Sequence, residues 1–299
     1  MSSLVTALLA AGCVSGDEKQ ARTAGDREAL ERRTGKAQAP AKPPPPRKID
    51  CDRLKCVALT FDDGPGPHTA RLLNTLKARG VRATFFMLGE NVEQHPGVVR
   101  RMAMEGHEVA NHTWSHPDLT GMSPASVRSQ MERTQKAIKD ASGVEPTLMR
   151  PPYGATDKEV GRAVGMPQIL WSVDTKDWLY RSVSRDVKVG IKQPERGGIV
   201  LYHDVHKESV DSMPKVVDGL KKRGFTLVTV TEMFRGEQLK PGETYTEAPV
   251  PAQPLTASPG PSAPTSPPTS SVTGSATGSP TGGSSTGTPG PPPSEESPN

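Results

Sequence analysis

Residues 57–88 read VALTFDDGPGPHTARLLNTLKARGVRATFFML. This stretch contains two short apolar runs rich in β-branched and aromatic residues, 57–61 and 83–88, and such runs predict buried strands. Between the two runs, the apolar residues of 69–79 recur with helical spacing, and Gly80 stands where a helix would end. The order strand, helix, strand predicts a parallel pair of strands joined by a helical crossover.

The same alternation continues to about residue 236. Further strands are expected at 108–111, 147–151, 169–173, 199–202 and 225–230. Helices are expected at 98–105, 124–142, 158–164, 183–192 and 209–223, with a short one at Glu232. Seven β/α units in about 185 residues predict an α/β fold with a parallel sheet, most simply closed into a barrel. A doubly wound open sheet is the alternative, because periodicity does not separate the two.

Composition divides the 299-residue chain into segments. Prolines concentrate in 40–46 and after residue 240, so 51–236 is the part expected to bury a core. A charged, then proline-rich tether is expected at 14–50, and a disordered Pro/Ser/Thr/Gly-rich tail at 237–299. The net charge of +4 is spread over interspersed charges, which gives no nucleic-acid footprint. Apolar runs are too short for a spanning helix.

The first 13 residues, MSSLVTALLAAGC, form an apolar stretch that ends in small residues before a cysteine. The stretch resembles the end of a bacterial lipoprotein signal, although no Lys or Arg precedes it and Ala10 stands where Leu is usual. The resemblance implies export and lipidation of Cys13, with the lipid as the anchor on the outer face of a bacterial plasma membrane. A disordered or partly buried apolar N-terminus is the alternative.

Two further cysteines, Cys51 and Cys56, stand close together before the first expected strand. In an exported protein such a pair indicates a disulfide. A metal site with this spacing is less expected, since no second Cys/His pair is nearby. Cys13 is then the odd cysteine that remains for lipidation.

Titratable and aromatic residues follow five of the expected strands. Active sites of β/α barrels are built from the loops at the carboxyl ends of the strands, so these residues are expected to meet in one site. The five segments are Thr60-Phe-Asp62-Asp63-Gly-Pro65, His112-Thr-Trp-Ser-His116-Pro117, Arg150-Pro-Pro-Tyr153, Asp174-Thr-Lys-Asp177-Trp178 and Leu201-Tyr-His203-Asp204.

A metal site is the first chemistry that these segments indicate. His112 and His116 form an i, i+4 pair, and a carboxylate from Asp62-Asp63 would complete a site of two histidines and one carboxylate. Adjacent side chains of an extended segment point in opposite directions, so one aspartate can bind metal while the other faces the substrate. Taken singly, the histidine pair could be a helix surface and Asp-Asp-Gly-Pro an ordinary turn.

In order and spacing, TFDDGP, HTWSHP, RPPY, DTKDW and LYHD resemble the five motifs of the polysaccharide deacetylase family (NodB homology, carbohydrate esterase family 4), over about residues 52–235. The resemblance implies a distorted (β/α)7 barrel and hydrolytic removal of acetyl groups from sugars. It also implies a divalent metal, usually Zn²⁺, with Co²⁺, Mn²⁺ or Ni²⁺ as alternatives.

Carried over position by position, the resemblance makes Asp63, His112 and His116 the metal ligands. It makes Asp62 the general base, held ionised and oriented by Arg150.

The resemblance also assigns residues to the substrate. The backbone N–H of Tyr153 would stabilise the oxyanion, and Trp178 and Leu201 would wall a pocket for the acetyl methyl group. His203 would be the general acid, with Asp174 as the carboxylate partner that raises its pKa.

We therefore expect a monomeric, exported, metal-dependent hydrolase that removes N-acetyl groups from N-acetylglucosamine units of peptidoglycan or a chitin-like polysaccharide. An O-deacetylase of the acetylxylan-esterase type is the alternative, because the same residues would serve it. A non-catalytic carbohydrate-binding wall protein is a third class, which the five complete motifs disfavour.

Overall fold

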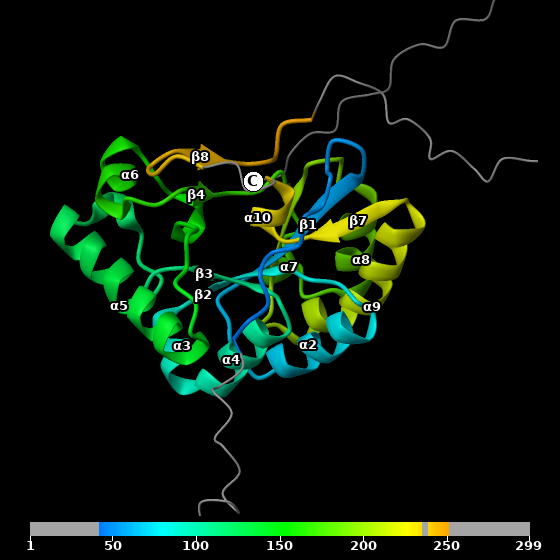
Figure 1. Ribbon diagram of the computed structural model, residues 1–299, viewed down its shortest axis with the longest axis horizontal. Helices are drawn as coiled ribbons and strands as arrows, with labels where there is room; N and C mark the ends of the chain where they lie inside the picture. Colours follow the sequence, from blue (N-terminus) through cyan, green and yellow to red (C-terminus); the bar gives the residue numbers. More distant parts are fainter. Residues whose placement is uncertain (1–41, 235–238, 251–299) are drawn as a thin grey trace, which may run out of the picture. The chain divides into compact units, whose positions relative to one another are not determined.

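The computed structural model describes residues 42–234 and 239–250 (Figure 1). The lipoprotein-like segment 1–13 with Cys13, most of the expected tether and the tail beyond residue 250 lie outside the described residues. Among the helices of the described part, none is both long and apolar enough to cross a membrane.

Most of the expected elements are confirmed to within one to three residues at each end. The strands are β1 (Lys55–Asp62), β2 (Thr84–Met87), β3 (Glu108–Asn111), β4 (Gln168–Ile169), β5 (Val173–Asp174), β6 (Ile199–His203), β7 (Phe225–Val228) and β8 (Thr244–Tyr245). The helices are α2 (Thr69–Ala78), α3 (Gly89–Gln94), α4 (Pro96–Met104), α5 (Pro124–Ser142), α6 (Lys158–Val164), α7 (Asp177–Tyr180), α8 (Val183–Lys192), α9 (Lys207–Lys222) and α10 (Val230–Met233), with 3₁₀ turns at Leu119–Gly121 and Pro152–Gly154. The short elements α3, α7 and β8 were not expected from the sequence.

The parallel sheet closes on itself. β1 pairs with β6 along one edge. Along the other edge its first half pairs with β7 and its last residues pair with β2. From β2 the ring continues through β3 to Met149, which forms single parallel bridges with Asn111 and with Gln168 at the start of β4. The chain runs on from β4 into β5, which pairs with β6. This ring confirms the barrel over the open doubly wound sheet.

Two of the expected strands differ from the prediction, and they distort the barrel. The stretch 147–151 contributes only the bridges of Met149, and the expected strand 169–173 is divided between β4 and β5. β4 pairs with β8, whereas β5 has turned to pair with β6.

Side chains of β1 alternate between two environments, as the two-residue period of a strand requires. Val57, Leu59 and Phe61 pack outward against the apolar faces of α2, α4 and α9, which lie in the arc of helices seen in Figure 1. Cys56 and Ala58 belong instead to the cluster that fills the barrel, together with Phe86, Ala110 and Ile199. By the same alternation Thr60 and Asp62 face the barrel interior. In register, Asp62 lies opposite His203 of β6, so both stand at the carboxyl end.

The folded part begins before residue 51, which corrects the expected tether of 14–50. The backbone N–H and the guanidinium of Arg47 both donate to Glu232, at 2.8 Å and 2.7 Å. Glu232 is buried and also completes the capping box of α10 with Thr229. A proline-rich segment can lie extended on a surface when one charged side chain anchors it, and composition alone does not reveal such an anchor.

The folded part also extends past residue 236, which corrects the expected tail of 237–299. β8 pairs with β4, where the backbone N–H groups of Gln168 and Leu170 donate to the carbonyls of Glu243 and Tyr245 at 2.9 Å and 2.8 Å. Further on, the N–H of Ala248 donates to the carbonyl of Gly197 at 2.9 Å. A two-residue strand is too short to show an alternating pattern in the sequence.

We expect a chain that ends at residue 250 to unfold at the same temperature as the full chain. A chain that ends at residue 240 loses the backbone hydrogen bonds of β8 and leaves the edge of β4 unpaired. At about 1 kcal/mol for each lost bond, its midpoint temperature should fall by at least about 4 °C. Thermal unfolding of the three chains checks this expectation, and equal midpoints for the chains ending at 240 and 250 would refute it.

Candidate active site

The segments at the carboxyl ends of the strands surround a pocket of about 440 Å³. The pocket brings together nearly all the expected site residues, with Arg150 buried behind them. Its lining consists of Asp62, Asp63, His112, His116, Pro151, Tyr153, Trp171, Asp174, Trp178, Leu201 and His203. Away from the pocket, a disulfide joins Cys51 to Cys56.

Arg150 lies fully buried inside the barrel and holds Asp62. Its Nη1 donates to Asp62 Oδ1 at 2.6 Å and to Thr60 Oγ1 at 2.9 Å. Its Nε and Nη2 donate to the carbonyls of Ile169 and Leu170, and its guanidinium stacks on the ring of Phe86 at 4.1 Å. Burial lowers the pKa of Arg150, and the Asp62 carboxylate counteracts that effect. The orientation of Asp62 is therefore fixed through one oxygen, and Oδ2 is left for other partners.

Asp63, His112 and His116 present ligand atoms that all lie within 4.8 Å of one another. Nδ1 of His112 lies 2.7 Å from the carbonyl of Arg150. Since a carbonyl oxygen only accepts, Nδ1 carries the hydrogen and Nε2 presents its lone pair to the site. Asp63 Oδ1 lies 3.5 Å from Nε2 of His112 and 3.6 Å from Nε2 of His116.

The donor set fits a divalent cation. Asp63 Oδ1 is buried and has no hydrogen-bond partner within the described structure, and a bound cation would satisfy it. Burial opposes the ionisation of Asp63, but the imidazole of His112 close to it, together with His203 and His116, outweighs burial and lowers its pKa to about 2. An ionised carboxylate and two imidazoles form a donor set typical of zinc and related metals.

His203 is paired with Asp177, which corrects the expected pairing with Asp174. Asp177 Oδ1 accepts from His203 Nδ1 at 2.9 Å, and Oδ2 accepts from the His203 backbone N–H at 2.8 Å. Ser209 Oγ also donates to Oδ2, at 2.5 Å. Asp174 instead accepts from the backbone N–H of Lys176 at 2.8 Å, as in a turn, and contributes to the pocket wall.

The pKa of His203 is raised to about 9. Burial by itself would lower this pKa, but the hydrogen bond and the charge of Asp177, together with the charges of Asp62 and Asp63, raise it. The imidazole is consequently protonated at neutral pH. Asp62 and Asp63 line the same pocket with their carboxyl groups, so proton-accepting and proton-donating groups share a common space.

The family model for polysaccharide deacetylase matches residues 50–168. The chain is 36% identical over 197 residues to the chitooligosaccharide deacetylase of Bradyrhizobium sp. (strain ANU 289), a match that covers 60% of this chain and 90% of that protein. The chain belongs to the polysaccharide deacetylase family.

Two further proteins extend the comparison. Peptidoglycan-N-acetylglucosamine deacetylase PgdA of Listeria monocytogenes is 47% identical over 192 residues, which cover 64% of this chain but 41% of the Listeria protein. The solved structure "T48 deacetylase with substrate" matches with a TM-score of 0.65 and 42% identity, over 66% of this chain and 99% of that one. The distorted (β/α)7 barrel of the polysaccharide deacetylases is thus the fold of this chain.

The mouth of the pocket is aromatic. The Tyr153 side chain is 69% exposed, and its ring packs edge-on against His116 at 4.6 Å between centroids. Trp178 is 46% exposed at the start of α7, whereas Leu201 is buried in the middle of β6. Trp171, which reads as a core residue of a strand, also lines the pocket, because the break between β4 and β5 places it there.

Asp177 is the functional residue that sequence reasoning missed. The segment DTKDW contains two aspartates three residues apart, and either could have been the partner of His203. The single helical turn α7, which begins at Asp177, places this aspartate at His203. A turn this short has no periodic pattern from which the sequence could predict it.

Asp186 of α8 lies near Asp177 and is buried, with neither carboxylate oxygen hydrogen-bonded in the described structure. Burial, and then the charges of Asp177 and Glu208, raise its pKa to about 7. The folded protein binds this proton more tightly than the unfolded chain does. The group therefore lowers stability as the pH rises from 3.8 to about 7, and the loss remains in full above that range.

Asp186→Asn should therefore raise the midpoint of thermal unfolding at pH 8 more than at pH 5. The replacement removes a buried charge that has no partner, a defect that costs about 1–3 kcal/mol or more. Unfolding curves of both proteins at the two pH values check the expectation. An equal or larger gain at pH 5 would show that the carboxylate is not the cause.

Proposed function

We propose that the protein is a metal-dependent hydrolase that removes N-acetyl groups from N-acetylglucosamine units of peptidoglycan or a chitin-like polysaccharide. One observation carries the proposal: Asp62 of β1 and His203 of β6 lie side by side in register and line one pocket, beside the ligand set of Asp63, His112 and His116. Hydrolysis of an amide needs a group that accepts a proton and another that donates one, and this arrangement supplies both.

Asp63, His112 and His116 would hold the metal, and we propose Zn²⁺ as the ion, with Co²⁺, Mn²⁺ or Ni²⁺ as alternatives. When bound, a divalent ion supplies Lewis-acid polarisation of the acetyl carbonyl and lowers the pKa of water. The hydrogen bond from His112 Nδ1 to the Arg150 carbonyl supports this role, because it fixes the ring orientation that a ligand needs.

The residues of the chain then divide the proton transfers between them. Asp62, held through Oδ1 by Arg150, accepts the proton of the attacking water at Oδ2. His203, kept protonated by Asp177, donates a proton to the amine nitrogen of the leaving sugar. The backbone N–H of Tyr153 stabilises the oxyanion, and Trp178 and Leu201 enclose the acetyl methyl group in the pocket.

The choice of substrate rests on the relatives. The curated members named above are described as deacetylases of peptidoglycan N-acetylglucosamine and of chitooligosaccharide. The Cys51–Cys56 disulfide supports an oxidising compartment, and hence export to the cell surface. Lipid attachment at Cys13 would then keep the enzyme at the outer face of the membrane.

Acetate release tests the proposal. The full chain should release acetate from N-acetylglucosamine oligomers and from peptidoglycan, lose this activity on treatment with a chelator, and regain it on addition of Zn²⁺. Acetylated xylan is the comparison substrate. Acetate released from xylan alone would replace the proposal by an O-deacetylase, and activity that survives complete metal removal would refute the metal's role.

A further inference from the structure

The loop between His112 and His116 sets the distance and direction of two of the ligands. Two residues of this loop, Thr113 and His116, have φ angles of 69° and 62°, in the left-handed region that side chains other than glycine rarely adopt. Such a loop keeps its shape only if surrounding groups hold it. The source of that support lies partly outside the five motifs.

Every backbone N–H from residue 113 to residue 116 is bound by a side-chain oxygen. Asn111 Oδ1 accepts from the N–H of Thr113 at 2.8 Å, and Thr113 Oγ1 accepts from that of His116 at 3.1 Å. The two N–H groups between them, of Trp114 and Ser115, both donate to Oε1 of Gln130, at 2.7 Å and 3.1 Å.

Gln130 belongs to α5, a long helix that can act as a rigid support. Ser123 caps its first turn, and Gly143 ends it in the left-handed conformation. Beside Gln130 on the same helix, the carbonyl of Met131 and Oε1 of Gln135 both accept from Asn111 Nδ2 at 3.0 Å. The loop is therefore tied to α5 at two points, through Gln130 directly and through Asn111.

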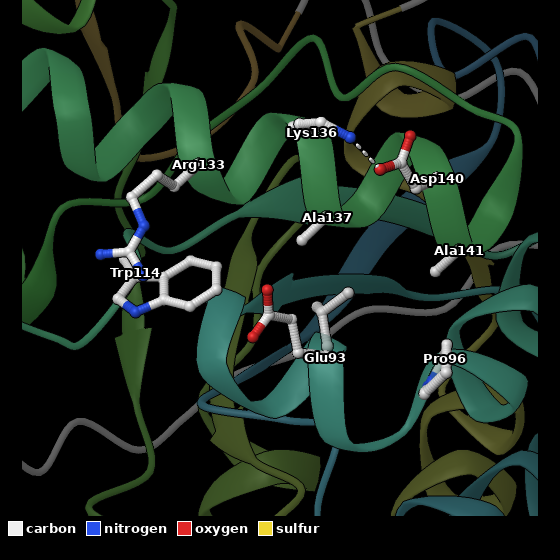
Figure 2. Close-up of a pocket in the computed structure, with 9 residues that line it drawn as sticks. Glu93, Pro96, Trp114, Arg133, Lys136, Ala137, Asp140 and Ala141 are labelled. Carbon is white, nitrogen blue, oxygen red and sulfur yellow. Dashed lines mark hydrogen bonds and ion pairs between the residues drawn. The ribbon is translucent and has the colours of Figure 1, made fainter.

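The side chain of Trp114 completes the attachment. It is buried against α3, where a Cβ atom at Gly89 would come within 2.2 Å of the indole. On the side of α5, the guanidinium of Arg133 lies 3.8 Å from the centre of the indole ring. Figure 2 shows the two side chains together in the wall of a pocket lined mainly by residues of α3 and α5. The N–H groups of Gly89 and Glu90 donate to the carbonyls of Thr113 and Trp114 at 3.0 Å and 3.2 Å.

We propose that Gln130 is a positioning residue for the metal: its Oε1 holds the loop in the conformation that aims His112 and His116 at the ion. Gln130 does not line the substrate pocket and would act only through the loop. Replacement of a residue that orients a metal ligand without binding the metal itself typically changes metal affinity by about 10–100-fold. The inference rests on the metal site of the proposed function.

Two substitutions distinguish the effect of the accepting oxygen from the effect of side-chain size. Gln130→Met keeps the length of the side chain but removes the acceptor, whereas Gln130→Glu keeps an accepting oxygen and loses only the bond from Nε2 to Ser115 Oγ. Gln94→Met, the same substitution at an exposed glutamine of α3, is the matched control.

The measurement is the Zn²⁺ affinity of the full chain by competition with a chromogenic chelator, with circular dichroism of the metal-free proteins as the check on folding. Gln130→Met should bind Zn²⁺ about 10–100-fold more weakly. Gln130→Glu and Gln94→Met should match the parent protein. At saturating Zn²⁺ acetate release by Gln130→Met should return, because Gln130 does not touch the substrate.

Unchanged Zn²⁺ affinity in Gln130→Met would overturn the inference, and so would a loss of turnover that excess Zn²⁺ does not restore. If Gln130→Met does not fold, the test rests on Gln130→Glu. A tenfold weaker Zn²⁺ affinity of Gln130→Glu would refute the role proposed for the accepting oxygen. A parent protein that binds no Zn²⁺ would instead refute the metal centre of the proposed function, so the two failures are distinguishable.

Discussion

Asp62→Asn should keep the metal and lose turnover by about 10²–10⁴-fold, the usual contribution of a general base. Arg150 can still donate to the oxygen of an asparagine, so the side chain should stay in place. What is lost is the accepting oxygen Oδ2, because an amide nitrogen takes its position and cannot receive the proton of water.

Asp63→Asn should do the reverse and empty the site. Its Oδ1 is buried between the Nε2 atoms of His112 and His116 and has no hydrogen-bond partner among the described residues, and an amide there removes the negative charge of the ligand set. Metal content and acetate release are measured side by side for the two variants. The two roles would be reversed if Asp62→Asn contained no metal while Asp63→Asn kept its metal and its activity.

Asp177→Asn should lower turnover on amide substrates by about 10²-fold or more, while Asp174→Asn should change it little. Asp177 accepts from the His203 ring, from its backbone and from Ser209, and an amide nitrogen at Oδ2 would face two donors instead of accepting them. His203→Ala should likewise keep the metal. Activated esters, whose leaving groups scarcely need a proton, should be affected less than amides.

The pH dependence of activity tests the pairing of His203 with Asp177 independently. His203 works in its protonated form, so activity is retained below its pKa and lost above it. Asp177 supplies the hydrogen bond and the charge that raise this pKa to about 9, so its replacement should move the alkaline limb to lower pH. Metal content and thermal midpoint are recorded as controls. A shift with Asp174→Asn and none with Asp177→Asn would restore the pairing expected from the sequence.

Long elements with capping residues were predictable. α5 begins at Pro124 after Ser123 and ends before Gly143, and both ends carry local signals that do not depend on the rest of the fold. The periodicity of the sequence did not separate a closed barrel from an open sheet, because closure depends on two single bridges of Met149; the family resemblance is what implied the barrel. The limits of the folded part were missed for a similar reason, since Arg47 and β8 are held by partners far away in the sequence.

The candidate site was predictable where a motif assigns one residue to one position. TFDDGP and HTWSHP bring Asp63, His112 and His116 together as expected. The motifs do not show which of two nearby aspartates turns toward His203, since that depends on the backbone of α7. Nor do they show Gln130, which lies on a helix and contacts only the backbone and a hydroxyl of the loop.

The burial of Arg150 divides the site into two parts with different local stability. Its guanidinium bonds to β1, to β4 and to the turn after β4 within the barrel core, so Asp62 can be released only when that core opens. Tyr153 lies 69% exposed on the 3₁₀ turn Pro152–Gly154, and an exposed turn opens at much lower free energy than a core does. Gentle heating should therefore loosen the Tyr153 side of the pocket first, while the base keeps its place until the whole barrel melts.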